Sequence, residues 1–272
     1  MANAAFGWPV FSDAGVTYTP TLSGGAWSSD LPLTNLQDRR LAKVARSDDA
    51  TAASTQFIID LKVARAVGVL GLFGHNISAA ATVQWLGGTT SGGSEVYAGS
   101  AVAVSYSAYS AEDLDGYTPA IILVPASAQT ARYWTCKVVD TTNADGYVEI
   151  GRATVCGIYQ PAINILVGAG AGLDTQTERK DTDGGADIFQ AKAIRRSWNI
   201  ILDDISESEA MTKAWRMQRL LGKHGQCVFL FDSADSYQHE RAILATLEEL
   251  GGLDYPYAVA RNRTALRIRE AL

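Results

Sequence analysis

Three short apolar runs, separated by turn-forming residues, constrain the fold of this chain more than any other feature. The runs are residues 57–61, 66–73 and 81–86, and a Gly-His-Asn turn at 74–76 separates the second from the third. Each run is too short for a membrane-spanning or coiled-coil helix, whereas runs of this length between turn residues are typical of strands covered on both faces. The sequence therefore predicts a two-layer β-sandwich around these runs.

The length of the chain indicates two domains, because 272 residues exceed the usual size of one. Hydrophobic residues make up 47% of the chain, which is enough for a sizeable core. We expect a first domain over residues 1–160, formed by an N-terminal arm and the sandwich, and a second over residues 161–272. The aromatic residues of the arm need burial, either on their own sandwich or on a neighbouring subunit.

The second domain is expected to combine strands with one helix. Polar, glycine-rich sequence between two strand-like runs predicts a long hairpin or a mobile insertion over residues 163–203. A helix is predicted over residues 206–222, because Ser206 and Glu209 form a capping box. Its apolar face consists of Ala210, Ala214, Met217 and Leu221, which follow one another at intervals of four, three and four residues.

Charge and cysteine content exclude several classes of protein. The formal net charge of −6 argues against a specific nucleic-acid partner. No apolar run has the length of a membrane span and the N-terminus lacks the pattern of a signal peptide, so we expect a protein made in the cytoplasm without a membrane partner. The three cysteines are widely spaced within apolar runs, which indicates reduced, packed thiols.

Two segments resemble ligand-binding motifs, a dinucleotide fingerprint and a calcium loop, but each lacks a residue that the motif needs. Residues 167–172 follow a strand, but Leu173 stands where the dinucleotide fingerprint has its last glycine, and the sequence after it is too polar for a packed helix. Residues 140–146 resemble part of a calcium loop, but Arg152 stands where a bidentate glutamate is needed. Hydrolase, zinc and phosphate-loop motifs are absent from the sequence. We therefore expect no enzyme activity, no metal and no cofactor.

The order of several segments resembles the galactose-binding-like jelly roll that tail-tip and baseplate proteins of tailed bacteriophages carry. The segments are LPLTNLQDRRLAKVARS (31–47), FIIDL (57–61), GLFGHNIS (71–78), ATVQW (81–85) and RYWTCKVVDTTNADGYVEIGR (132–152). They lie in the first three fifths of the chain. The later order of strand, helix and several strands resembles the tail-tube-like β-barrel of distal tail proteins. Together these resemblances imply a mainly β chain, with a jelly roll followed by a tube-like domain with one flanking α-helix.

The resemblance also implies a function. It suggests a virion protein, made in the host cytoplasm, that forms part of a homo-oligomeric ring between the tail tube and the hub. Its partners would be other tail proteins, including the tail tube, the hub and the tape measure. The second domain would form the ring and the jelly roll would decorate the outside. The alternative is a carbohydrate-binding module that recognises a host surface glycan.

Two sets of residues are candidates for binding. His75 and Asn76 follow a buried strand, where a sugar-binding jelly roll presents polar groups; alternatively, they form a turn that satisfies local backbone groups. A second set lies in the last predicted strand, on the face opposite Asn262, Thr264, Leu266 and Ile268, and consists of Arg261, Arg263, Arg267 and Arg269. These arginines form either a subunit interface or a solvated face.

Overall fold

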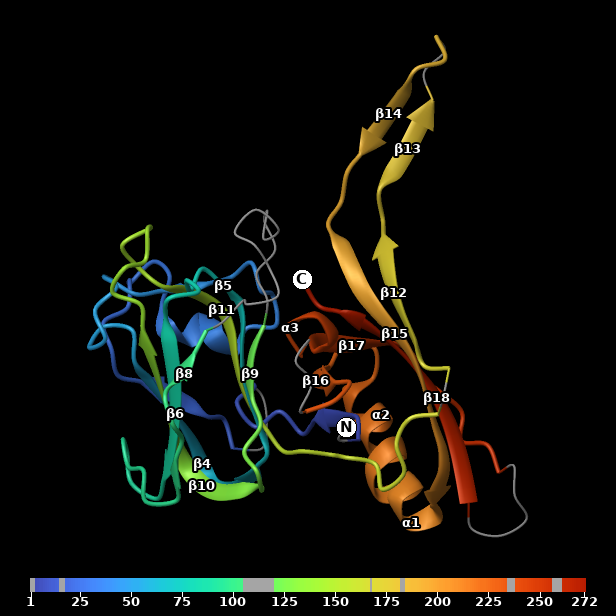
Figure 1. Ribbon diagram of the computed structural model, residues 1–272, viewed down its shortest axis with the longest axis horizontal. Coiled ribbons are helices and arrows are strands. Elements are labelled where there is room, and N and C mark those ends of the chain that lie inside the picture. The colour runs from blue at the N-terminus through green and yellow to red at the C-terminus, as the bar shows by residue number, and fades with distance from the viewer. Residues whose placement is uncertain are drawn as a thin grey trace. The chain divides into compact units, whose positions relative to one another are not determined.

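The computed structural model describes residues 3–14, 18–104, 120–166, 168–181, 184–233, 238–255 and 261–272. Within these residues the chain is mainly β with one sustained helical stretch, which confirms the predicted fold class. The chain divides into two compact units (Figure 1). The first is Met1–Gln160 with Cys227–Leu244 and Leu272, and the second is Pro161–Gln226 with Ala245–Ala271.

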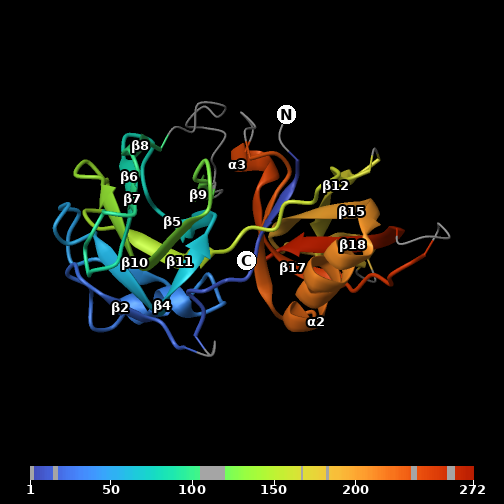
Figure 2. The ribbon, with the colours of Figure 1, turned by 90° about the horizontal axis from the view of Figure 1, so that it is seen from below.

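The first unit contains a sandwich of two antiparallel sheets (Figure 2). One sheet contains β2 (Thr21–Ser23), β4 (Phe57–Val67), β6 (Thr82–Gly88), β7 (Tyr97–Ala98), β8 (Val102–Ala103) and β10 (Gln129–Val139). Its order is β2-β4-β10-β6-β7, and β8 also pairs with β6. The other sheet contains β3 (Ala45–Arg46), β5 (Val69–His75), β9 (Ile121–Leu123) and β11 (Glu149–Cys156), in the order β3-β11-β5-β9. A 3-10 helix, η1 (Leu33–Gln37), precedes β3.

The three apolar runs all form strands, but the second run belongs to two of them. Residues 66–73 cover the end of β4 and most of β5, which lie in different sheets. Gly68 is the single residue between these strands, and a Cβ atom there would lie 2.4 Å from Cγ2 of Ile158. Glycine permits this close approach, so the chain passes from one sheet to the other without a loop.

Aromatic side chains from the strands fill the core of the sandwich. Phe57, Trp85 and Trp134 are fully buried, and the rings of Phe57 and Trp85 meet edge to face with their centroids 6.0 Å apart. Trp134 lies opposite Gly87 of the neighbouring strand, where a Cβ atom would lie 3.1 Å from the indole. The absence of a side chain at Gly87 therefore makes room for Trp134. Burial of each such residue contributes roughly 1.5–3 kcal/mol.

The N-terminal arm packs on its own unit. Its strand β1 (Ala5–Gly7) pairs antiparallel with β16 (Gln226–Leu230), and Phe6 lies opposite Phe229. The ring of Phe6 also stacks on Tyr159, with the centroids 5.8 Å apart. This pairing explains why residues 227–244 fall in the first unit, whereas the division drawn from the sequence placed them in the second. Pairing between segments so far apart in the chain leaves no local signal in the sequence.

The second unit is built around the long strand β15 (Ile194–Ser206). This strand pairs with β12 (Gly170–Thr175) on one side and β18 (Arg261–Glu270) on the other, and β18 pairs in turn with β17 (Ile243–Glu249). Beyond β12, the strands β13 (Glu178–Asp181) and β14 (Asp187–Gln190) pair with each other. Figure 1 shows them extending away from the sheet as a two-stranded ribbon. The hairpin expected over residues 163–203 takes this form in the structure.

One continuous helical stretch packs in the second unit. It comprises α1 (Glu207–Glu209), the π-helical segment η2 (Ala210–Trp215) and α2 (Arg216–Leu221), while a short helix, α3 (Gln238–Arg241), lies in the first unit. The Ser206 hydroxyl accepts a hydrogen bond from the Glu209 N–H at 3.2 Å, and Gly222, at φ +52°, follows the last turn. The four residues expected on the apolar face are all buried.

Candidate interaction surfaces

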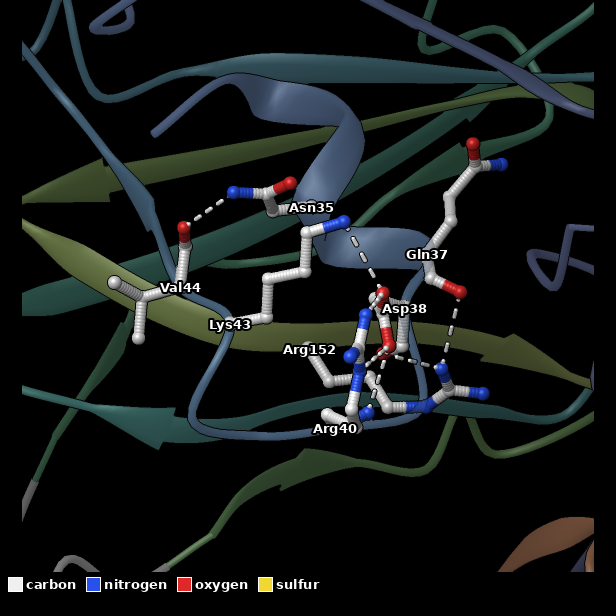
Figure 3. Close-up of polar contacts among 7 residues, drawn as sticks. All are labelled: Asn35, Gln37, Asp38, Arg40, Lys43, Val44 and Arg152. Carbon is white, nitrogen blue, oxygen red and sulfur yellow. Dashed lines mark hydrogen bonds and ion pairs between the residues drawn. The ribbon is translucent and has the colours of Figure 1, made fainter. Parts of the chain in front are cut away.

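The first motif of the jelly-roll resemblance, residues 31–47, is held in place by a buried arginine of β11. Arg152 is fully buried, and its guanidinium donates to the carbonyl oxygens of Asp38 at 2.9 Å and Gln37 at 3.4 Å (Figure 3). It also forms an ion pair with Asp13 of the N-terminal arm. One side chain therefore connects the arm, the segment after η1 and the second sheet, which gives the motif a structural role.

Further polar side chains of this motif bind within the chain (Figure 3). The Asn35 amide donates to the carbonyl oxygen of Val44 at 2.8 Å. Asp38 accepts from Arg40 at 2.8 Å and from Lys43 at 3.2 Å. These hydrogen bonds, that with Arg40 foremost, hold the pKa of the Asp38 carboxyl well below its usual range. This partly exposed carboxylate is thus kept ionised by its own loop.

His75 and Asn76, the predicted glycan contacts, lie where β5 ends and make local contacts. His75 is buried, and its Nδ1 accepts from the N–H of Ile77 at 3.2 Å. The Asn76 amide donates to Asp145 at 2.8 Å and to the carbonyl oxygen of Tyr147 at 3.1 Å. Its oxygen accepts from a backbone N–H of β11 at 2.7 Å. These bonds fit the turn alternative, and a glycan contact at this pair stays a prediction.

The turn at residues 140–146 is closed by hydrogen bonds of its own. Asp140 accepts from the hydroxyl of Ser78 at 2.6 Å and from the amide of Asn143 at 2.9 Å. In the described part of the chain, no three histidine, cysteine, aspartate or glutamate side chains lie close enough together to hold a metal ion.

The four arginines of β18 share one face of the strand with Ala265, and the residues between them are buried. Arg261 forms an ion pair with Asp204 at 3.4 Å. Arg267 pairs with Glu248 at 2.8 Å, and Arg269 lies 3.6 Å from the same carboxylate and 3.7 Å from Asp174. Arg263 pairs through its backbone with Asp254. Three of the four charges are thus compensated inside the second unit, and a subunit contact at this face stays a prediction.

The three cysteines are free and buried, as predicted. Burial raises the pKa of the Cys227 thiol to about 12 and also raises that of Cys136. Burial likewise raises the pKa of Cys156, well above its ordinary value. Since the thiolate is the reactive form, these side chains are inert in the folded chain.

The ribbon is a strongly exposed part of the second unit. We define it as residues 173–194, the ends of β12 and β15 together with β13 and β14. All residues of β13 and β14 are exposed. Four large apolar side chains of the ribbon are at least 58% exposed: Leu173, Ile188, Phe189 and Ile194. Exposed apolar side chains gathered on a projecting element indicate an interaction surface.

A second surface, which the sequence analysis does not identify, lies on the helix. Trp215 and Leu250 are nearly half exposed, and with Gln218, Arg219 and Gly251 they line a groove of about 210 Å³. The signal was present in the sequence, since residues 210–231 contain four lysines and arginines and no acidic residue. The amphipathic pattern identified the buried side of this helix and left its exposed side unassigned.

The first unit has a concavity of about 340 Å³. Ser127, Gln160 and Ser233 provide polar groups there, beside apolar surface from Val124 and Ile158. His75 and Asn76 do not line it. Among the described residues, no helix is long and apolar enough to cross a membrane.

No protein-family model and no curated protein matches this chain. Solved structures do resemble it. The lectin domain of lectinolysin, complexed with Lewis B antigen, is 13% identical over 55% of this chain and 97% of its own, with a TM-score of 0.38. The family 32 carbohydrate-binding module of C. perfringens NanJ, in complex with galactose, is 13% identical over 52% of this chain and 93% of its own (TM-score 0.35). A further family 32 module, from a Clostridium perfringens family 31 glycoside hydrolase, is 15% identical over 54% of this chain and 98% of its own (TM-score 0.35). The resemblance is one of fold.

Proposed function

We propose that this chain is a structural subunit of a bacteriophage tail tip or baseplate, and that it forms part of a ring joining the tail tube to the hub. The proposal rests on the order of sequence segments, which resembles that of phage tail-tip and baseplate proteins, and on one structural observation, the ribbon. A two-stranded ribbon on its own is at best marginally stable in water. Its exposed apolar side chains therefore favour a role in which a neighbouring protein covers them.

The edge of the sheet supports the same role. β12 forms one end of its sheet, so its outer backbone groups have no partner strand among the described residues. Assemblies of identical subunits often cover such edges, and a closed ring leaves none of them open. In this proposal the second unit forms the ring and the jelly roll lies outside it, in a virion assembled in the host cytoplasm. The partners are the tail tube, the hub and the tape measure.

Shortening the ribbon tests this function. Residues 176–192 would be replaced by a two-residue turn that joins β12 directly to β15, which keeps the paired part of the hairpin intact. We expect a folded protein that no longer enters phage tails, measured by immunoblotting of purified particles. A matched control shortens the exposed loop at residues 89–94 of the first unit, which we expect to leave incorporation unchanged. Normal incorporation of the ribbon variant would refute the proposal.

A carbohydrate-binding module is the second candidate, and the concavity of the first unit favours it. Hydroxyl and amide groups beside apolar surface are the combination that small polar ligands use, and its volume lies at the lower end of the usual range. The Ser127→Trp variant would fill this space. If the chain binds sugars there, glycan-array binding by the unaltered protein disappears in the variant. Absence of binding by the unaltered protein would remove this candidate.

A further inference from the structure

The exposed side of the helical stretch carries an uncompensated positive charge. We call it the helix face, and it consists of Met211, Lys213, Trp215, Arg216, Arg219 and Leu220. In the part of the chain that the structure describes, Lys213, Arg216 and Arg219 form no ion pair. This contrasts with β18, where Glu248 pairs with Arg267 and Arg269, and Asp174 also pairs with Arg269. The helix face therefore lacks the acidic partners that the arginines of β18 find within the chain.

The groove beside this face is fixed in shape. Gln218 is buried, and its side-chain oxygen accepts from the N–H of Gly251 at 2.7 Å while its amide donates to Thr264 at 3.3 Å. A Cβ atom at Gly251 would lie 1.8 Å from the carbonyl oxygen of Ala265, so only glycine fits there. The loop that carries Leu250 is thus held against the helix, and Leu250 and Trp215 are kept exposed side by side.

The size and charge of the groove indicate what would bind there. At about 210 Å³ it is smaller than a small-molecule pocket, which spans roughly 300–1,000 Å³. It therefore suits one large apolar side chain of a protein segment. Because Arg219 lines the groove and Lys213 and Arg216 lie on the same helical stretch, that segment should carry carboxylates next to its apolar residue.

The end of the ribbon has this chemistry. From Asp181 to Phe189 the sequence contains three aspartates and no basic residue, and it ends in Ile188 and Phe189. Arg179 pairs with both Asp181 and Asp187, and Lys180 lies opposite Ile188. With four acidic and two basic residues, the hairpin of residues 178–190 keeps a net charge of −2. Neighbouring strand residues point to opposite faces, so Ile188 and Phe189 cannot both be covered by the same surface. One of them can enter a groove while the other faces a further neighbour.

The ribbon and the groove lie at opposite ends of the second unit. Figure 1 shows β13 and β14 at one end and α1 and α2 at the other. The two surfaces of a single copy therefore do not meet, whereas those of two copies can. Such head-to-tail contacts between different surfaces generate a ring when the rotation closes and a filament when it does not.

We propose that the end of the ribbon of one copy docks into the Trp215–Leu250 groove of a second copy, with its carboxylates against the bases of the helix face. This inference rests on the proposed function, because it names the surface that covers the ribbon in the ring. It also gives the positive helix face an acidic partner.

Cysteine cross-linking between two variants of the full chain tests this contact. One variant carries Ile188→Cys and the other Leu250→Cys, both at exposed positions. The three native thiols are buried and stay unreactive, so they add little background. Under mild oxidation we expect a covalent dimer in the mixture that neither variant gives alone. A matched control replaces Leu250→Cys with Val139→Cys, at an exposed position of the first unit, and should give no dimer.

Charge reversal separates docking from random collision. Adding Arg219→Glu to the Leu250→Cys chain should strongly reduce the dimer, because the groove would then repel the aspartates of the ribbon. Absence of dimer in the original mixture, or a dimer insensitive to Arg219→Glu, would overturn the inference. A dimer formed by the Ile188→Cys variant alone would also overturn it, since that result indicates a symmetric ribbon-to-ribbon contact.

The cross-linking experiment and the ribbon-shortening experiment distinguish failure of this contact from failure of the proposed function. If cross-linking fails but the shortened ribbon still abolishes incorporation into tails, the structural function stands and the ribbon binds a different surface. If cross-linking succeeds while the shortened ribbon enters tails normally, the contact between copies stands and the proposed function fails.

Discussion

Replacing Arg152 by methionine should destabilise the first unit severely. The guanidinium binds the Asp13 carboxylate and the carbonyl oxygens of Gln37 and Asp38, and methionine fills much of the same space without replacing any of these bonds. Asp13 would then stay buried with only Arg39, which is partly exposed and 3.6 Å away. Removing one partner of a buried pair costs about 3–5 kcal/mol, because the other charge is left without compensation.

This loss is large compared with the stability of a typical domain, about 5–15 kcal/mol. With a slope near 2 kcal/mol per molar urea, a loss of that size lowers the midpoint of urea unfolding by roughly 2 M. Unfolding of the full chain would be followed by tryptophan fluorescence, because Trp85 and Trp134 lie in the core of the same unit.

The pair formed by Arg132 and Asp60, with 2.8 Å between the charged groups, provides the matched control. Arg132 is 40% exposed, and Asp60 keeps the ammonium of Lys62 at 3.2 Å when Arg132 is removed, so Arg132→Met should shift the midpoint less than Arg152→Met. The double variant Arg152→Met, Asp13→Leu should recover part of the loss, since no uncompensated charge remains. If Arg152→Met costs no more than Arg132→Met, the assignment of Arg152 as the connector of arm and sandwich is wrong.

Three further predictions concern the surface. Hydrogen bonds from the Thr89 side chain and from backbone N–H groups lower the pKa of Glu95 from 4.5 to about 2. The contribution of Glu95 to stability is therefore present above pH 4.5 and lost as the pH falls toward 2. Glu95→Gln should flatten the pH dependence of the urea midpoint between these two values. His75→Ala with Asn76→Ala should leave tail assembly intact, and loss of host adsorption with normal tails would favour the glycan function. Arg267→Gln with Arg269→Gln should reduce incorporation into tails if β18 forms a contact, whereas normal particles assign it to a solvated face.

The elements with local signals could be predicted from the sequence. The helix is predictable because Ser206 and the spacing of its apolar residues are local features, and the alternation in β18 is predictable for the same reason. The pairing of β1 with β16 and the change of sheet at Gly68 depend on distant residues. They therefore leave no periodic pattern to read.

For the candidate sites, too, local features could be predicted from the sequence and long-range contacts could not. In the sequence Arg152 stands out only as a residue that breaks a calcium pattern, because its acceptors, Asp13 and two carbonyl oxygens, lie far away in the chain. The arginines of β18 were singled out as a row of like charges, but the positions of Glu248 and Asp204 beside them depend on strand register. Charge compensation is a property of the folded unit, so it could not be judged from the row itself.

The buried thiols also allow local opening of the folded chain to be measured by their rate of chemical labelling. Cys136 lies in β10 of the sandwich, whereas Cys227 lies in β16, which holds the N-terminal arm. A thiol reagent modifies each side chain only during the moments when its strand separates, so the two labelling rates measure two local opening equilibria in an unmutated protein. If the arm detaches before the sandwich opens, Cys227 reacts first. Simultaneous reaction of both would mean that arm and sandwich open as one cooperative unit.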